Sequence, residues 1–162
     1  MGGGIMKIFT IWFLVVFAAA GLSSCGSGNA SEKTRQVIFT ADAPAPVGAY
    51  SQGILFGDVL SLSGQVGIDP ATGNLVEGGV VSEAEQALKN LGAILRAAGM
   101  GYEDAVMATV FLTSIDDYAA VNALYATYFT TDPPARQVVA VDALPKGASV
   151  EISLVAMKGS IL

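Results

Sequence analysis

The chain has 162 residues, 52% of them hydrophobic, and carries 8 basic against 14 acidic side chains with no histidine. The missing histidine excludes a Ser-His-Asp triad, a Cys-His dyad and every histidine-ligated zinc site. The net charge of -6 disfavours nucleic acid as a partner, because binding to phosphate backbones depends on basic patches.

The N-terminal segment has the features of an export signal. Residues 8–21 form an apolar run that follows Lys7 and ends in small residues. A membrane-spanning helix needs roughly 20 apolar residues, and this run is shorter, which favours a secretory signal. The stretch LSSC, residues 22–25, resembles the bacterial lipobox, in which the cysteine is lipidated and becomes the new N-terminus.

We therefore expect a lipoprotein signal peptide over residues 1–24, lipidation at Cys25, a flexible tether over 25–34 and a folded domain over 35–162. This predicts an exported protein of the bacterial cell envelope, anchored on the periplasmic or outer-membrane side. Alternatively, Cys25 is an incidental residue of a cleavable signal or a short anchor. It is the only cysteine, so no intramolecular disulfide can form.

Strand patterns come first along the domain. RQVIFT, residues 35–40, reads as a strand, and residues 53–69 read as a hairpin with its turn at 57–58 and its return strand over 59–66. A turn cluster, DPATGN, follows at residues 69–74.

A helix is predicted over residues 82–100, where apolar side chains recur at helical spacing. Ser82 is the expected N-cap, with Glu85 completing a capping box, and Gly99 fits the C-terminal cap. The remaining elements are a strand over 105–114, a helix over 115–130 and strands over 136–144 and 149–157.

This order of elements predicts an α+β fold. Helices do not alternate regularly with strands, so the expected architecture is one mixed β-sheet with two helices on one face. The strands carry apolar residues on both sides, and the face without helices must find a partner. We therefore expect an oligomer built face to face on its sheets.

Four motifs together carry a resemblance to a known family. They are PVGAYSQG at 46–53, LSGQVGIDPATG at 62–73, VNALYATYF at 121–129, and PPARQVV followed by LPKGASVEI within 133–152. In this order and spacing the chain resembles the RidA/YjgF family of reactive-intermediate deaminases over about residues 36 to 158.

The resemblance implies a homotrimer with a chorismate-mutase-like fold, in which the sheets face a central barrel and the active sites lie between subunits. It also implies a substrate that is a small enamine or imine derived from an amino acid, such as 2-aminoacrylate or 2-iminobutanoate. Water replaces the nitrogen, giving a 2-keto acid and ammonia, and neither a metal nor an organic cofactor is expected.

Within this resemblance Arg136 matches the arginine that grips the substrate carboxylate, a task that suits a planar guanidinium. Glu151 matches the carboxylate that orients or activates water. Alternatively, Arg136 forms a salt bridge at the rim, and Glu151 simply points to water in an alternating strand.

Four more positions match residues of the family cleft. Tyr50 would cover a planar substrate, while Ser63 and Asn122 could donate or accept hydrogen bonds, or only fasten backbone. Val138 stands where the family often has cysteine, which removes a thiol but keeps a backbone contact.

Gln137 and Asp142 also depart from the residues usual in the family, so the identity of the substrate stays open. Gly64 is expected to allow a close approach of backbone.

Two hypotheses therefore compete. One is a hydrolytic enamine/imine deaminase, and the other is a non-catalytic trimer at the envelope that binds small carboxylates or partner proteins. RNA cleavage is disfavoured by the acidic balance and the missing histidine.

Overall fold

A computed structural model describes residues 34–159 together with Met1. The predicted signal peptide and tether, with Cys25 between them, lie outside the described residues except for Met1 and Thr34. Among the described residues, no helix combines the length and the apolar character needed to cross a bilayer.

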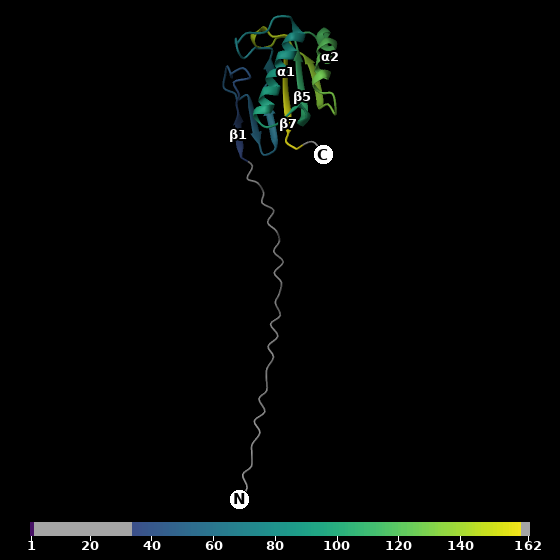
Figure 1. Cartoon of the computed structure of the whole chain (residues 1–162). Coiled ribbons are helices and arrows are strands. Elements are labelled where there is room, and N and C mark those ends of the chain that lie inside the picture. Colours follow the sequence, from purple (N-terminus) through teal and green to yellow (C-terminus); the bar gives the residue numbers. More distant parts are fainter. Residues whose placement is uncertain (2–33, 160–162) are drawn as a thin grey trace. The chain divides into compact units, whose positions relative to one another are not determined.

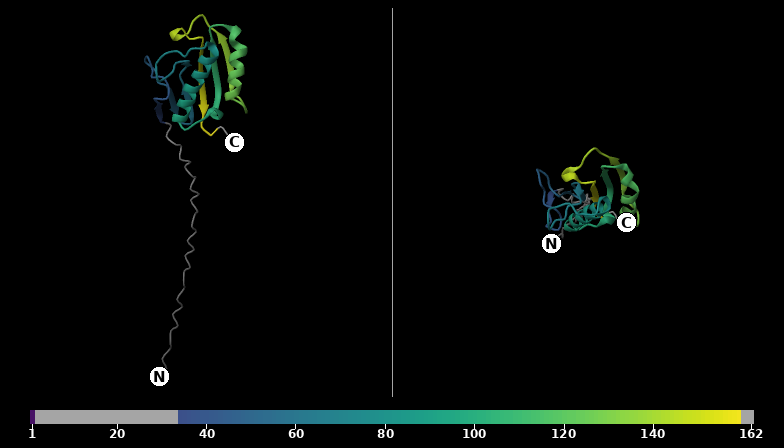
Figure 2. Two further views of the ribbon diagram at one scale, coloured as in Figure 1. Left: turned by 45° about the horizontal axis from the view of Figure 1, so that its top comes forward. Right: turned by 90° about the horizontal axis from the view of Figure 1, so that it is seen from above.

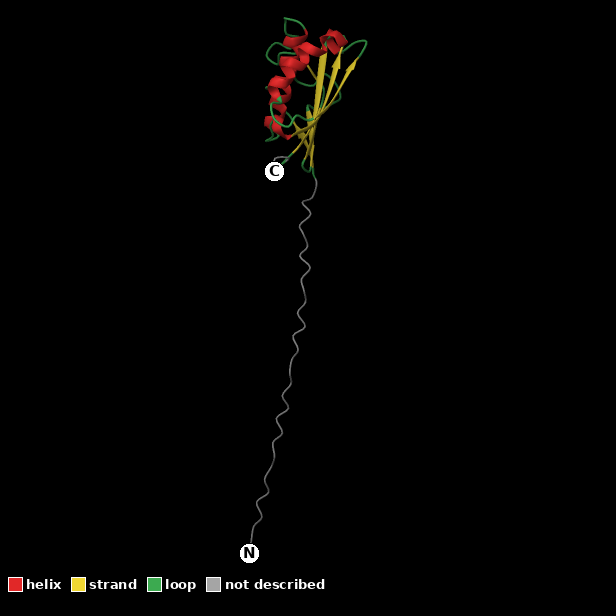
Figure 3. Cartoon of the chain, turned by 90° about the vertical axis from the view of Figure 1, so that its right-hand side faces the viewer, coloured by secondary structure: helices red, strands yellow, loops and turns green. Residues whose placement is uncertain are grey.

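The domain is one sheet with both α-helices on the same face, as predicted (Figures 1 and 3). Its strands are β1 (Arg35–Ile38), β2 (Gly53–Phe56), β3 (Val59–Leu62), β4 (Gln65–Val66), β5 (Ala105–Leu112), β6 (Ala135–Ala140) and β7 (Val150–Met157). Its helices are α1 (Val80–Ala97) and α2 (Tyr118–Tyr128), with short 3-10 turns η1 (Tyr102–Asp104), η2 (Ile115–Asp117) and η3 (Pro145–Gly147).

The sheet is mixed. Its strands follow the order β1-β2-β3-β7-β5-β6, with β4 also paired to β7. The pairing of β5 with β6 is parallel, with α2 in the connection, and the other pairings are antiparallel. Figure 2 shows β1 at one edge of the sheet and α2 beside the opposite edge. The α+β class and the mixed sheet predicted from the sequence are confirmed.

Helix α1 supplies the centre of the core. Its residues Leu88, Leu91 and Leu95, one turn apart on one face, are fully buried. At its C-terminus Gly99 has φ 72°, and the backbone N–H groups of Gly99 and Met100 donate to Arg96 and Leu95, which is a Schellman motif. The predicted role of Gly99 is confirmed.

The predicted capping box at the start of α1 is wrong. The helix begins two residues before Ser82, and Gly79 is the N-cap without a side-chain hydrogen bond. The glycine at position 79 has φ 79°, so it can turn the chain into the helix earlier than the Ser82 signal indicates. The carboxylate of Glu85 instead pairs with Lys89 at 2.8 Å.

The predicted return strand over 59–66 is interrupted. Strand β3 ends at Leu62 and β4 begins at Gln65. Ser61 pairs with Val155 and Gln65 with Ile152, so four steps along one strand face three along β7. The extra residue is a bulge at 63–64, a feature that often redirects side chains beside functional sites.

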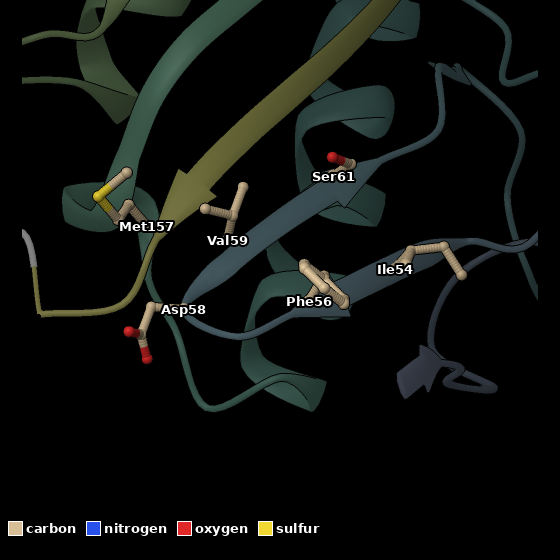
Figure 4. Close-up of a pocket in the computed structure, with 6 residues that line it drawn as sticks. All are labelled: Ile54, Phe56, Asp58, Val59, Ser61 and Met157. Carbon is tan, nitrogen blue, oxygen red and sulfur yellow. The ribbon is translucent and has the colours of Figure 1, made fainter. Parts of the chain in front are cut away.

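The sheet face opposite the helices is apolar, and no other described residue covers it. It exposes large hydrophobic side chains, among them Val37, Phe56, Val59 and Val139. Figure 4 shows a part of this face on the β2–β3 hairpin and the end of β7. The sequence-based expectation of a bare apolar face is confirmed, whereas the oligomer inferred from it stays a prediction.

Candidate functional site

Glu151 lies on β7 beside the bulge. It pairs with Val66 of β4 on one side and Phe111 of β5 on the other, and its side chain is half-buried. A Cβ placed on Gly64 would lie 1.9 Å from Glu151 Oε1, so the carboxylate rests directly on the glycine. The sequence predicts a close approach of backbone at Gly64, whereas the group found against it is the side-chain carboxylate of Glu151. Burial raises the pKa of Glu151 above its ordinary value of 4.5.

Glu151 faces a cavity of about 280 Å³, which we call the acid cavity. Tyr50, Ser63 and Lys146 also line it, so two of the predicted site residues join the carboxylate here. The phenol oxygen of Tyr50 accepts the Val47 backbone N–H at 3.3 Å, which fixes the ring at the cavity wall. The Ser63 hydroxyl donates its hydrogen bond to the Ser51 backbone carbonyl at 2.7 Å. The lone pairs of the same oxygen can accept a hydrogen bond from a ligand.

Arg136 projects from β6 toward α2. Its Nη2 donates to Asn122 Oδ1 at 2.7 Å and to the Tyr118 hydroxyl at 3.3 Å. Its Cζ lies 4.5 Å from the centroid of the Tyr125 ring, a cation–π contact that supports one face of the guanidinium. Arg136 forms no ion pair with any described residue, which argues against the rim salt bridge within one chain.

The surroundings leave part of this guanidinium available. A hollow of about 330 Å³ lies beside it, bounded by α2 and by the pair Pro133 and Pro134. The contacts to Asn122 and Tyr118 both use Nη2, so the other N–H groups can meet a planar anion. A guanidinium held in this way is pre-organised for a carboxylate.

Val138 follows Arg136 on the same face of β6. It is half-buried, packs against the core and lines a narrow hollow together with Arg136 and Asn122. Gln137 lies on the opposite face and donates to Thr109 Oγ1 at 3.3 Å. Asp142 is exposed beyond the end of β6.

The predicted residues thus form two groups on opposite faces of the sheet. Arg136 pairs with Ala108, which pairs with Leu154, and this row is packed under the helices. Glu151 is three residues from Leu154 and therefore points to the other face, because side chains alternate along a strand. Strand β5 also stands between β6 and β7. Within one chain, Arg136, Asn122 and Val138 therefore lie on the other side of the sheet from the acid cavity.

Three further residues belong to these groups. Lys146, at φ 62°, lines the acid cavity, and Tyr118 and Tyr125 hold Arg136. Burial raises the pKa of Tyr125 to about 12, against the opposing charge of Arg136, so its phenol stays neutral. No motif in the sequence indicates the contact of Tyr125 with the guanidinium, because Arg136 lies on a separate strand. For Lys146, the LPKGASVEI motif was the available signal.

No metal centre is visible in the described part of the chain. Residues 34–159 contain no group of three or more Asp, Glu, Cys or His side chains placed to hold a metal ion.

Comparison with known proteins gives consistent matches. Residues 40–158 match the profile of the family described as Endoribonuclease L-PSP. The chain is 51% identical over 125 residues to 2-iminobutanoate/2-iminopropanoate deaminase of Rattus norvegicus, covering 77% of this chain and 91% of that one.

Solved structures match the fold. RidA from an Antarctic Psychrobacter is 43% identical with a TM-score of 0.73, over 75% of this chain and 98% of that chain. The YjgF gene product of E. coli is 40% identical with a TM-score of 0.73, over 76% and 98%. The relatives named here each align with 75–77% of this chain and with 91–98% of their own length.

Proposed function

Because the chain belongs to the RidA/YjgF family, we propose that it is a hydrolytic deaminase of small imines and enamines derived from amino acids. The products are a 2-keto acid and ammonia. The observation that carries this proposal is that one chain presents two groups: a half-buried carboxylate of raised pKa that lines a cavity, and a guanidinium that has no counter-ion among the described residues.

Arg136 binds the carboxylate of the substrate in this proposal. Asn122 and Tyr118 occupy Nη2, and Tyr125 supports one face of the guanidinium, so its free N–H groups are fixed before the ligand arrives. Charge-assisted hydrogen bonds of this kind contribute about 1.5–3 kcal/mol each. In the same proposal the backbone of Val138, two residues further along β6, also contacts the substrate.

Glu151 handles the proton of the attacking water. Its carboxylate takes a proton as the water oxygen bonds to the imine carbon, and the C=N electron pair moves to nitrogen. The proton then passes from Glu151 to nitrogen, which gives a carbinolamine. Glu151 next takes the hydroxyl proton and passes it to nitrogen as the C–N bond breaks, so that the ketone and ammonia form. A general base of this kind increases the rate on the order of 10²–10⁴-fold, and it works best when its pKa lies near the working pH. The raised pKa of Glu151 is closer to neutral pH than the ordinary value of 4.5.

The two groups meet when a second copy of the chain supplies one of them. Each chain holds both groups but on opposite faces of its sheet, and residues 34–159 leave the apolar open face uncovered. We propose a homotrimer whose open faces turn inward, with Arg136 of one copy beside Glu151 of the next. Sedimentation analysis that finds only monomers would contradict it.

The experiment that tests the function is ammonia release from 2-aminoacrylate and 2-iminobutanoate generated in situ. We expect the full-length chain to accelerate both and Arg136→Ala to lose most of this activity with a higher KM. Equal rates for wild type and Arg136→Ala would exclude the guanidinium clamp.

A non-catalytic binding role is the second candidate. It is favoured by the export signal expected over residues 1–24, because that signal would place the domain away from the cytosolic enzymes that form reactive imines. Calorimetry would then detect 2-keto acid binding without turnover of the imine, whereas turnover at an enzymatic rate rejects it.

The place of action is part of the proposal. We propose that Cys25 carries a lipid at the bacterial cell envelope and that the polar segment after it links the lipid to the domain. Labelling with an alkyne-tagged fatty acid should mark the wild-type chain and not Cys25→Ala. Labelling of both chains to the same extent would contradict the anchor.

A further inference from the structure

A second hollow adjoins the acid cavity and has no part in the chemistry above. It measures about 280 Å³ and shares Tyr50, Gly64, Lys146 and three apolar residues with the acid cavity. Beyond that common wall it continues between the segment at Pro44 and Ala45 and the segment at Pro70. The two hollows are therefore neighbouring lobes on either side of Tyr50, within reach of one small ligand.

The wall of this second lobe is mainly apolar. Pro44, Ala45 and Pro70 line its far part, and Val66 and Ile68 its common part. No carboxylate lines it, and the buried amide of Gln65 donates to the Ser63 carbonyl at 3.4 Å. Lys146 is exposed, so its alkyl stem can border the lobe while the ammonium stays in water. An apolar group suits such a wall, since it gives up no hydrogen bonds on entering.

Buried amide side chains hold the two chain segments that form the opposite walls of the second lobe. Gln52 is 1% exposed, and its Nε2 contacts the carbonyls of Thr40, Ala43 and Pro44 at 3.0–3.2 Å, while its Oε1 accepts the Thr40 N–H at 2.7 Å. This holds the segment that carries Pro44 and Ala45.

The opposite wall is held in the same manner. Asn90 is fully buried, and its Nδ2 donates to the carbonyl of Ile68 at 2.9 Å and reaches that of Val66 at 3.4 Å. Buried and satisfied polar groups of this kind fix backbone in one arrangement. The second lobe is thus preformed, as small-molecule sites usually are.

We propose that the second lobe receives the substrate side chain, and that the preferred substrates are 2-imino acids with apolar side chains of three or four carbons. The inference rests on the proposed function, because it takes Glu151 as the group beside the imine carbon. From there a chain of this length passes Tyr50 into the second lobe. The volume of about 280 Å³ is far more than a methyl group fills.

The expected selectivity follows from apolar burial. Each buried methylene group increases kcat/KM about fourfold. The leucine-derived imine has three more side-chain carbons than the alanine-derived imine, so its kcat/KM should be about 60-fold higher.

The test measures kcat/KM of the full-length chain for imines made in situ by an amino acid oxidase from alanine, norvaline, leucine and glutamate. Trapping with semicarbazide reports the remaining imine. Ala45→Phe fills the exposed rim of the lobe, and Ala97→Phe, at an exposed site of α1, is the matched control. We expect Ala45→Phe to lower kcat/KM for leucine imine at least tenfold, with alanine imine within twofold and the control unchanged.

The outcomes separate this inference from the function on which it rests. Equal wild-type kcat/KM for alanine and leucine imines, or equal losses for both in Ala45→Phe, would overturn the side-chain lobe alone. A preference for glutamate imine over leucine imine would also overturn it, because Lys146 would then be selecting a second carboxylate. No acceleration of any imine by the wild-type chain would overturn the proposed function as well.

Discussion

Replacing Gly64 by alanine should disable Glu151 while the fold remains. The added Cβ would lie 1.9 Å from Glu151 Oε1, 2.7 Å from Cδ and 3.0 Å from Cγ. An ordinary contact needs about 3.4 Å or more, so the carboxylate must move by about 1.5 Å. A displacement of about 1 Å at a reacting group can cost about 10²-fold. We therefore expect kcat to fall about 100-fold.

Stability should change much less in the same variant. The group that must yield is the end of a flexible side chain, and the φ of Gly64 lies outside the left-handed region, so alanine brings no backbone strain there. Thermal unfolding should stay within a few degrees of wild type, while the semicarbazide assay reports the lost activity. Gly48→Ala is the matched control, because its Cβ would meet the Tyr50 ring at an ordinary 3.6 Å. A folded Gly64→Ala with wild-type kcat would refute the role of Glu151.

Three further predictions concern Asn122, Glu151 and Glu83. Asn122→Ala frees the Arg136 guanidinium and should raise KM about tenfold with little change in kcat, measured with 2-iminobutanoate; an unchanged KM would contradict this. A carboxyl whose pKa is raised in the folded chain binds its proton more tightly there, so wild type loses stability as pH rises from 4.5 through the raised pKa. Glu151→Gln should therefore melt higher than wild type at pH 7, and the difference should shrink toward pH 4; a difference independent of pH would argue against a desolvated carboxylate. Glu83→Ala removes the acceptor of the Ser149 N–H and hydroxyl, at 2.7 and 3.1 Å, and should lower the free energy of unfolding by about 1–3 kcal/mol in urea, whereas Glu85→Ala should cost at most about 1 kcal/mol.

The fold was predictable because its signals are local. Apolar spacing located α1 and α2, and alternation with turn residues located the strands within a few positions. The start of α1 was misjudged, because the pattern of Ser82 and Glu85 is a stronger sequence signal than a glycine with positive φ. The break between β3 and β4 was missed because a bulge depends on the partner strand.

The motifs single out Arg136, Glu151, Tyr50 and Ser63 as candidates, but no motif determines how the four side chains are arranged in space. That depends on the register through β5, which joins residues far apart in the sequence. The support given to Arg136 by Tyr125 has the same non-local origin.

The most direct test of a site shared between copies is to mix two inactive variants of the chain and to measure the activity that returns. Arg136→Met retains Glu151, and Glu151→Gln retains Arg136, so each lacks one group that the proposed site draws from a different copy. After the two are unfolded and refolded together in equal amounts, about one quarter of the interfaces in random trimers pair an intact Arg136 with an intact Glu151. The account predicts recovery of about one quarter of the wild-type imine deaminase activity. Mixed trimers, verified by mass spectrometry, that remain inactive would contradict a site shared between copies.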